Sequence, residues 1–379
     1  MLSMIYLDNA AATPLDGTVI NAMQPYWQDK FFNASAGYLA AKQVHQDIQK
    51  ARASVAKILG SRPSEVIFTA GGTEADNLAI NGVMQAHPKA NLVISAVEHK
   101  AILEVARQYP YQVVPVGVNG LVDIEKLVEQ INDKTVLVSV MYANNELGTV
   151  QPITKIGQAI QKIKQDRNQR GIKLPLYFHT DASQAPNYLN LQVNRLAVDL
   201  MTLNGGKIYG PKQTGALYVK AGTVIKGQIR GGGQEHNLRS GTENVAGIIG
   251  FTRALEIAQL IRPEEAKRLA ELQIQFESQL DKLPKVVINA HQNRLPNFVH
   301  ITIKGFDNEQ LMMQLDEAGI ICAVGSACSA SNEEPSHVLK AIGLSKAEAQ
   351  SSLRFSMGRQ TSPKDIKKTV QTLTKLLNM

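Results

Sequence analysis

The sequence predicts an α/β protein with a mostly parallel β-sheet in a large domain, followed by a smaller α+β domain. Short apolar segments of strand length alternate with segments of helical periodicity as far as about Gly250. Several of the strand segments are apolar on both faces, which is typical of strands in a sheet that helices cover on both sides. Beyond Gly250 the order changes to a long helix, one strand and two further helices, as expected for a separate α+β unit.

The predicted elements of the large domain begin with a helix. Apolar residues recur at helical spacing from Val44 to Leu59, and Gly60 suits the position that follows the end of a helix. The strands that follow are expected at Val66–Thr69, Leu92–Ala96, Val136–Met141, Leu176–His179, Val198–Leu203 and Gly215–Val219. Their alternation with helical segments favours a parallel sheet.

The predicted elements of the smaller domain include a capped C-terminal helix. The elements before it are expected at Glu264–Leu280 (helix), Phe298–Ile303 (strand) and Glu309–Ala318 (helix). The last helix begins after Ser362, which suits the N-cap position, and Pro363 suits the first helical position. Asp365 then completes the pattern with an acid in the first turn.

The composition is that of a globular protein with a hydrophobic core. The chain has 379 residues, of which 44% are hydrophobic and 19% charged, and its formal net charge is +7. The longest apolar segment, Val245–Ile261, contains Arg253 and Glu256, so we predict no membrane span. Aromatic residues make up only 5%, which argues against direct nucleic-acid binding. The start of the chain lacks a signal-peptide pattern, and two cysteines are too few for a disulfide framework. We therefore expect a cytoplasmic protein.

Polar side chains follow the predicted strands at their carboxyl ends, where open α/β sheets bind their ligands. After the first strand, the segment Ala70–Glu74 combines two glycines with Thr73 and leads into a helix. Backbone N–H groups at such a helix start bind anions, although the segment lacks the glycine spacing of a dinucleotide site. The other strand ends carry Glu98-His99-Lys100, Asn144-Asn145-Glu146, Asp181 with Gln184, and Asn204-Gly205-Gly206-Lys207.

This set of residues meets the chemical requirements of pyridoxal 5′-phosphate. That cofactor needs a lysine for a Schiff base, a carboxylate that faces its ring nitrogen and an anion site for its phosphate. Lys207 and Asp181 supply the first two, and the glycines with Thr73 supply the third. His99 is placed to stack on the ring. Lys212 is a weaker candidate for the Schiff base, because the preceding proline places it in a turn. The sequence suggests no metal site.

A second set of reactive side chains lies in the smaller domain. Small polar residues surround Cys328 within Val324–Asn332, which predicts a loop that carries a nucleophilic thiol. Cys322 lies among apolar residues, and we expect it to be buried. Arg354 is a candidate for binding a substrate carboxylate through two hydrogen bonds, although its spacing fits a surface ion pair equally well.

Segments along the whole chain carry a family resemblance. They are Tyr6–Ala10, Phe68–Asn77, Glu98–Lys100, Asn144–Gly148, Asp181–Gln184, Lys207–Pro211, Arg239–Thr242, Gly325–Cys328 and Arg354–Gly358. In these segments the chain resembles the cysteine desulfurases of the NifS/IscS type, which are class V aminotransferases of the pyridoxal-phosphate-dependent fold type I. The resemblance implies a large cofactor-binding domain at residues 14–250. It also implies a small domain that combines residues 1–13 with 251–379 and carries the Cys328 loop.

The resemblance also implies a role for each candidate residue. Lys207 holds the cofactor covalently and later moves the substrate Cα proton, and the Cys328 thiolate attacks the substrate sulfur. His99 is the third catalytic residue that the resemblance implies. Cofactor contacts are implied for Gly72, Thr73, His99, Asn145, Asp181, Gln184, Asn204, Gly206 and Lys207, and for Thr242 reaching across a homodimer. Substrate contacts are implied for Asn33 and Arg354.

The implied reaction removes sulfur from L-cysteine and gives L-alanine and a Cys328 persulfide. The persulfide then passes to a sulfur-acceptor protein, such as an iron–sulfur scaffold or a tRNA-thiolation enzyme. The loop from Gly325 to Pro335 has the longer form that resembles group I enzymes, which supply several acceptors. Two alternatives stay open: a selenocysteine lyase or related carbon–sulfur lyase, and a catalytically weak scaffold that binds partners without turnover.

The chain departs from the family pattern near the expected phosphate site. The family has a histidine directly before the cofactor lysine, where this chain has Gly206. Tyr38 stands in place of another histidine, Ala34 and Ala41 replace a proline and a glycine, and Ala12 replaces a common threonine. We therefore expect weaker anchoring of the cofactor phosphate, and a gain in cofactor retention when Gly206 is changed to histidine.

Overall fold

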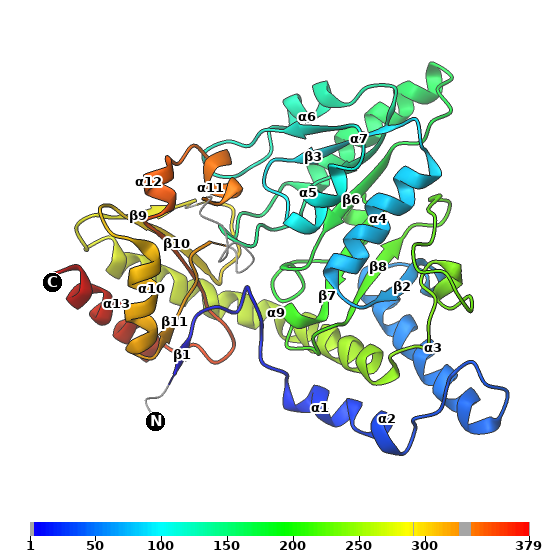
Figure 1. Cartoon of the computed structure of the whole chain (residues 1–379), viewed down its shortest axis with the longest axis horizontal. Helices are drawn as coiled ribbons and strands as arrows, with labels where there is room; N and C mark the ends of the chain where they lie inside the picture. Colours follow the sequence, from blue (N-terminus) through cyan, green and yellow to red (C-terminus); the bar gives the residue numbers. More distant parts are fainter. Residues whose placement is uncertain (1–3, 291, 326–334, 379) are drawn as a thin grey trace.

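The computed structural model describes residues 4–290, 292–325 and 335–378. Two units lie side by side, and the larger one is built on a seven-stranded sheet (Figure 1). Its strands are β2 (Val66–Thr69), β3 (Asn91–Ser95), β4 (Tyr111–Val114), β5 (Thr135–Ser139), β6 (Tyr177–Asp181), β7 (Leu200–Asn204) and β8 (Gly215–Val219). They lie in the order β2-β8-β7-β6-β5-β3-β4, and all neighbours are parallel except that β8 pairs antiparallel with β2 and β7. The predicted α/β class with a mostly parallel sheet is confirmed.

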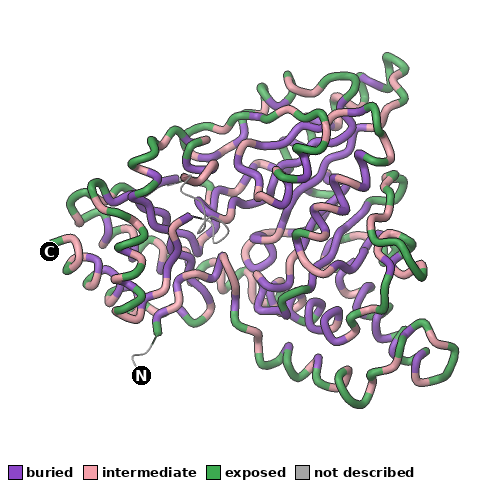
Figure 2. The backbone as a smooth tube through the Cα atoms, viewed as in Figure 1, coloured by how far each residue is buried: buried purple, intermediate pink, exposed green. Residues whose placement is uncertain are grey.

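Helices cover both faces of this sheet, because successive side chains of each strand point to opposite sides. In β2, Val66 and Phe68 belong to one hydrophobic core and Ile67 belongs to the other. The first core includes α3 (Leu39–Leu59), α7 (Ile153–Gln169) and part of α9 (Val245–Leu280), and the second includes α4 (Gly72–Ala86) and α5 (Lys100–Ala106). The short helices are α1 (Gly17–Met23), α2 (Pro25–Gln28), α6 (Ile124–Gln130) and α8 (Val193–Leu196). Figure 2 shows the resulting buried layer through the middle of the unit.

The six strands predicted for this unit are present, with ends that differ by no more than a few residues. The edge strand β4 was missed. Of its residues only Val114 is buried, while Tyr111 and Val113 are exposed, so the apolar pattern of a covered strand is absent from this segment.

The smaller unit contains two further sheets. Strands β9 (Val286–Asn289), β10 (Phe298–Ile303) and β12 (Ser352–Ser356) form an antiparallel sheet with β10 in the centre. Strand β1 (Ile5–Tyr6) pairs in parallel with β11 (Ile320–Ile321). The helices are α10 (Asn308–Glu317), α11 (His337–Ala341), α12 (Lys346–Ala349) and α13 (Pro363–Leu377). Ile5 and Leu7 lie in the same hydrophobic core as β10 and β12, so the beginning and the end of the chain pack together.

Helix α9 connects the two units, and its predicted start at Glu264 is wrong. The helix begins at Val245 and continues through Pro263 to Leu280. A proline lacks the N–H of a helical hydrogen bond and suits a first helical turn, which is why the sequence pattern favoured a start directly after it. Apolar side chains of α9 as far as Ala258 belong to the core of the large unit, and those from Leu269 onward belong to the core of the small one.

The predicted domain boundary at residue 250 thus falls inside a continuous helix, and the division of the chain into domains stays a prediction. The same helix contains the apolar segment that was considered for a membrane span. Within the described ranges, no helix is long and apolar enough to cross a membrane.

Candidate active site

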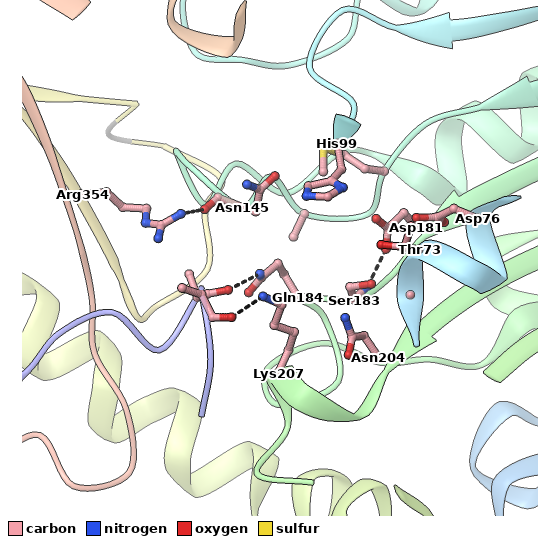
Figure 3. Close-up of a pocket in the computed structure, with 15 residues that line it drawn as sticks. Thr73, Asp76, His99, Asn145, Asp181, Ser183, Gln184, Asn204, Lys207 and Arg354 are labelled. Atoms are coloured by element: carbon pink, nitrogen blue, oxygen red, sulfur yellow. Dashed lines mark hydrogen bonds between the residues drawn. The ribbon is translucent and has the colours of Figure 1, made fainter. Parts of the chain in front are cut away.

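A cavity of about 270 Å³ lies at the carboxyl edge of the large sheet, where the small unit meets it (Figure 3). The predicted site residues that line it are Gly72, Thr73, His99, Asn145, Asp181, Gln184, Asn204, Lys207 and Arg354. Strand ends and helix starts place them: Asp181 and Asn204 are the last residues of β6 and β7, and Gly72 is the first residue of α4. The structure thus brings residues from distant parts of the sequence to one side of one sheet.

The start of α4 forms an anion site in this cavity. Gly71 precedes the helix with φ at 139°, a backbone conformation that favours glycine. A Cβ atom at Gly72 would lie 3.0 Å from Ser183 Oγ and 3.2 Å from Asn204 Nδ2. Because glycine leaves this space open, an anion can approach both the backbone N–H groups and these two polar side chains.

The lysine of the site is fixed by contacts to the N-terminal segment. Lys207 Nζ donates a hydrogen bond to the carbonyl oxygen of Ala11 at 2.5 Å, and Gln184 Nε2 donates to that of Ala10 at 3.0 Å (Figure 3). Asn187 Nδ2 holds the backbone of Lys207 through its carbonyl oxygen at 2.8 Å. The amine of Lys207 is therefore held in the cavity by a neutral acceptor.

Two buried acids close enough to Asp181 to feel its charge, Asp76 and Glu98, have raised pKa values. Asp76 is fully buried, and burial, followed by the charge of nearby Asp181, raises the pKa of its carboxyl well above the usual range. Burial also raises the pKa of Glu98 to about 8. Both pKa shifts favour the protonated, uncharged form of these two carboxyl groups. The carboxylate of Asp181 accepts a hydrogen bond from the backbone N–H of Ser183 at 2.8 Å, which orients it in the lining of the cavity.

His99 caps α5 and presents a neutral ring to the cavity. Its Nδ1 accepts a hydrogen bond from the N–H of Ala101 at 3.1 Å, so the neutral ring carries its proton on Nε2. Burial lowers the pKa of His99, and this outweighs the opposite effect of the Asp181 carboxylate. A neutral, flat ring is the form that suits stacking on an aromatic cofactor.

Arg354 is buried rather than exposed, so the surface ion pair considered for it is excluded. Its side chain is 2% exposed and pairs with Asp8 through Nη2 at 2.5 Å. Nη1 donates to the carbonyl oxygen of Asn145 at 2.8 Å. Its Nε has no hydrogen-bond partner among the described residues. Arg354 lines the cavity, and a guanidinium in that position is suited to bind a small carboxylate.

Three predicted site residues in the described part of the chain do not line this cavity, and a fourth lies outside that part. Asn33 is exposed, and its Oδ1 accepts a hydrogen bond from Ser35 N–H at 2.9 Å. Thr242 is also exposed on the surface of the chain. Gly206 borders an adjoining opening instead. Cys328 lies outside the described residues. The roles of these four residues stay predictions.

Sequence reasoning missed several residues that line the cavity. Ala10 and Ala11 contribute carbonyl oxygens from the start of the chain, and an alanine gives no chemical signal in a sequence. Asp76 had a usable signal, because it lies three residues after Thr73 and therefore on the same side of the helix. Ser183 follows Asp181 by two residues in the same turn.

Comparison with known proteins assigns the chain to a family. Residues 5–369 match the family described as aminotransferase class-V, and the chain belongs to that class. A cysteine desulfurase IscS from Dictyoglomus turgidum is 39% identical over 98% of this chain and 94% of its own length. One from Clostridium botulinum is 37% identical over 100% and 95%. The solved NifS-like protein from Rickettsia africae has a TM-score of 0.89 at 31% identity and covers 99% of this chain and 100% of its own. Within the class, the chain belongs to the cysteine desulfurases, as the sequence predicted.

The predicted cofactor, pyridoxal 5′-phosphate, is the cofactor of this family. The residues of the cavity fit it on their own chemistry. The anion site at Gly72 suits a phosphate, and the carboxylate of Asp181 suits a protonated ring nitrogen. The amine of Lys207 suits a covalent link to the cofactor.

Below the cavity, His179 makes the stability of the fold depend on pH. It is fully buried in β6, between the hydroxyl groups of Ser139 (2.9 Å) and Thr202 (3.1 Å), and burial lowers its pKa to about 3. The unfolded chain binds a proton at this histidine near pH 6.5. Its contribution to the free energy of unfolding is thus fully present above pH 6.5 and is lost as the pH falls toward 3, by about 1.4 kcal/mol per pH unit.

We expect His179→Gln to be less stable than the wild type at pH 7.5, and this difference to shrink by about 1 kcal/mol at pH 5.5. Urea unfolding of both proteins at the two pH values measures it. Titrating groups away from His179 are common to both proteins and cancel, whereas Asp76 Oδ1 lies 3.7 Å from His179 Nε2, so the comparison is repeated in an Asp76→Asn background. A difference that stays constant between the two pH values would contradict the prediction.

Proposed function

We propose that this protein removes sulfur from L-cysteine, releases L-alanine and carries the sulfur as a persulfide on Cys328. The observation that carries the proposal is the arrangement of Lys207, Asp181 and His99 around one cavity beside the anion site of Gly72. The identity to curated cysteine desulfurases supports it. We also propose that the protein acts in the cytoplasm, because its two cysteines indicate a reducing compartment.

In this proposal the cavity residues bind the cofactor and the substrate. Gly72, Thr73 and Asn204 hold the phosphate, Asp181 accepts a hydrogen bond from the ring nitrogen, and His99 stacks on the ring. Asn145 and Gln184 contact the ring substituents. Bound pyridoxal phosphate supplies an electron sink for the pair left when the substrate Cα–H bond breaks.

Arg354 binds the substrate carboxylate in this proposal. Its place in the lining of the cavity and its charge-paired contact with Asp8, a carboxylate, support this role. The carboxylate of the substrate would compete with that of Asp8 for the same guanidinium, so binding exchanges one charged partner for another. The substrate then lies next to Lys207, whose amine takes the Cα proton.

The sulfur transfer itself is assigned to Cys328. Its thiolate attacks the substrate sulfur, so that a sulfur–sulfur bond forms while the bond between Cβ and sulfur breaks. The carbon keeps the electron pair and takes up a proton, which yields the methyl group of alanine. The persulfide then passes to an acceptor protein, an iron–sulfur scaffold or a tRNA-thiolation enzyme.

We propose that the protein acts as a homodimer in which Thr242 reaches the phosphate site of the other subunit. Two observations support this. Thr242 is exposed and lies outside the cavity of its own chain. Large apolar side chains are also exposed near the start of α3: Trp27 is 56%, Phe31 67% and Leu39 84% exposed. Such a group of side chains is typical of a protein–protein interface.

The function is tested with purified protein loaded with pyridoxal phosphate and given L-cysteine. We expect equal amounts of alanine and of protein-bound or released sulfur. A parallel assay with L-selenocysteine separates the alternatives: a selenocysteine lyase would act on that substrate alone. Protein that binds the cofactor but produces no alanine from either substrate would support the catalytically weak scaffold instead.

A further inference from the structure

A second opening adjoins the active-site cavity on the side of the expected phosphate site. It measures about 630 Å³ and shares Thr73, Asn204 and Lys207 with the cavity. Gly206 and Lys212 line it as well. Because Gly72 and Thr73 at the start of α4 line both spaces, an anion bound there also borders the second opening.

Residue 206 offers no side chain to a phosphate in this chain. As glycine it has no side chain, and its N–H already donates to Asn204 Oδ1 at 3.0 Å. Its carbonyl oxygen accepts hydrogen bonds from the N–H of Thr13 at 3.1 Å and from its hydroxyl at 3.2 Å. A Cβ at this position would meet Asn204 Oδ1 and Lys212 Cγ at 3.5 Å, which is ordinary contact. A side chain therefore has room at position 206, and the positively charged Lys212 lies next to this space.

The ammonium group of Lys212 has a weak partner in the structure. Its Nζ donates to the carbonyl oxygen of Thr13 at 3.3 Å, which is long for such a bond. No described carboxylate pairs with it. The acid in the same opening, Glu74, is held by Arg239 through Nε at 3.0 Å. Lys212 can therefore exchange a weak neutral partner for an anion.

The turn that carries Lys212 is fixed at its base. Thr214 Oγ1 donates to the carbonyl oxygen of Pro211 at 2.6 Å, and Gly205 N–H donates to that of Thr214 at 2.8 Å. A Cβ at Gly205 would collide with Thr214 Oγ1, so the two segments pack closely. The backbone of Lys212 is thereby held beside Gly206 while its side chain remains exposed.

We infer that Lys212 binds the phosphate of the cofactor and supplies the positive charge that Gly206 does not. This inference rests on the proposed function, because it takes pyridoxal phosphate as the ligand of the cavity. An ammonium binds phosphate as a point charge and needs no fixed orientation, so a flexible lysine at the mouth of the opening is adequate. Lys207 and Lys212 thus have separate tasks, the first at the reacting carbon and the second at the phosphate.

The test compares cofactor binding with and without the phosphate group. Apoprotein of the wild type and of Lys212→Met is titrated with pyridoxal phosphate and with pyridoxal, and the bound fraction is measured by equilibrium dialysis. We expect Lys212→Met to weaken binding of pyridoxal phosphate about tenfold, the loss of one charge-assisted contact, and to leave pyridoxal binding unchanged. Lys212→Arg should bind both as the wild type does. Lys367→Met, an exposed lysine on α13, controls for the change in net charge.

The double variant Gly206→His/Lys212→Met provides a second test. If Lys212 supplies the charge that a histidine at position 206 would supply, Gly206→His restores most of the affinity for pyridoxal phosphate that Lys212→Met loses. The gain in affinity from Gly206→His is then larger in the Lys212→Met background than in the wild type. Unchanged binding by Lys212→Met, or an equal loss for pyridoxal phosphate and pyridoxal, would overturn the inference. A wild-type protein that binds both compounds equally weakly would instead overturn the proposed cofactor site.

Discussion

Replacing Lys207 by alanine is expected to lower alanine production from L-cysteine by about 10⁴-fold or more. The variant loses both the covalent link to the cofactor and the amine that takes the substrate proton. The structure explains why a neighbouring group does not replace it. Lys207 Nζ is held in the cavity by Ala11 O, whereas Lys212 lies in the adjoining opening and contacts Thr13 O.

The assay for Lys207→Ala is run at saturating pyridoxal phosphate, with alanine measured directly. Lys212→Met is the matched control, because excess cofactor should restore most of its activity while leaving Lys207→Ala inactive. Circular dichroism establishes that both variants are folded. Activity of Lys207→Ala within tenfold of the wild type would contradict the role assigned to this lysine.

Replacing Cys328 by serine is expected to abolish persulfide formation, and alanine production with it. A serine hydroxyl is a poor nucleophile toward sulfur, and the other cysteine of the chain cannot substitute. Cys322 is 6% exposed beside β11, and burial raises the pKa of its thiol to about 12. At neutral pH almost none of it is thiolate, the form that attacks.

Cys322→Ala is the matched control for Cys328→Ser. It removes the other thiol from the chain and should retain both alanine production and the persulfide, which a thiol-specific label and mass spectrometry locate on Cys328. Persulfide on Cys322, or full activity of Cys328→Ser, would contradict the assignment of the nucleophile.

The sequence predicted most of the candidate site because its chemistry is local. Asp181, Asn204 and the glycines before α4 each follow a strand of recognisable apolar character, and parallel strands bring such residues to one edge. The fold class was predicted from the alternation of short apolar strand segments with helical segments. His99 was predicted in the same way, because it lies shortly after the end of a predicted strand.

The parts that could not be predicted depend on contacts between distant segments. Ala10 and Ala11 act through backbone carbonyls, which any residue has. The burial of Arg354 depends on its pairing with Asp8, more than 300 positions away. The continuation of α9 through Pro263 is a case in which packing against two cores outweighs the local preference of proline.

The pairing of β1 with β11 has a consequence for the synthesis of the protein. Ile5 is synthesised more than 300 residues before its partner Ile320. At about 5–20 residues per second, the first strand waits on the order of tens of seconds before it can pair. The two carbonyls that hold Gln184 and Lys207 follow directly after this strand. The nascent chain can therefore form most of its large sheet early, whereas the carbonyls that hold Lys207 and Gln184 are anchored only after β11 has been made.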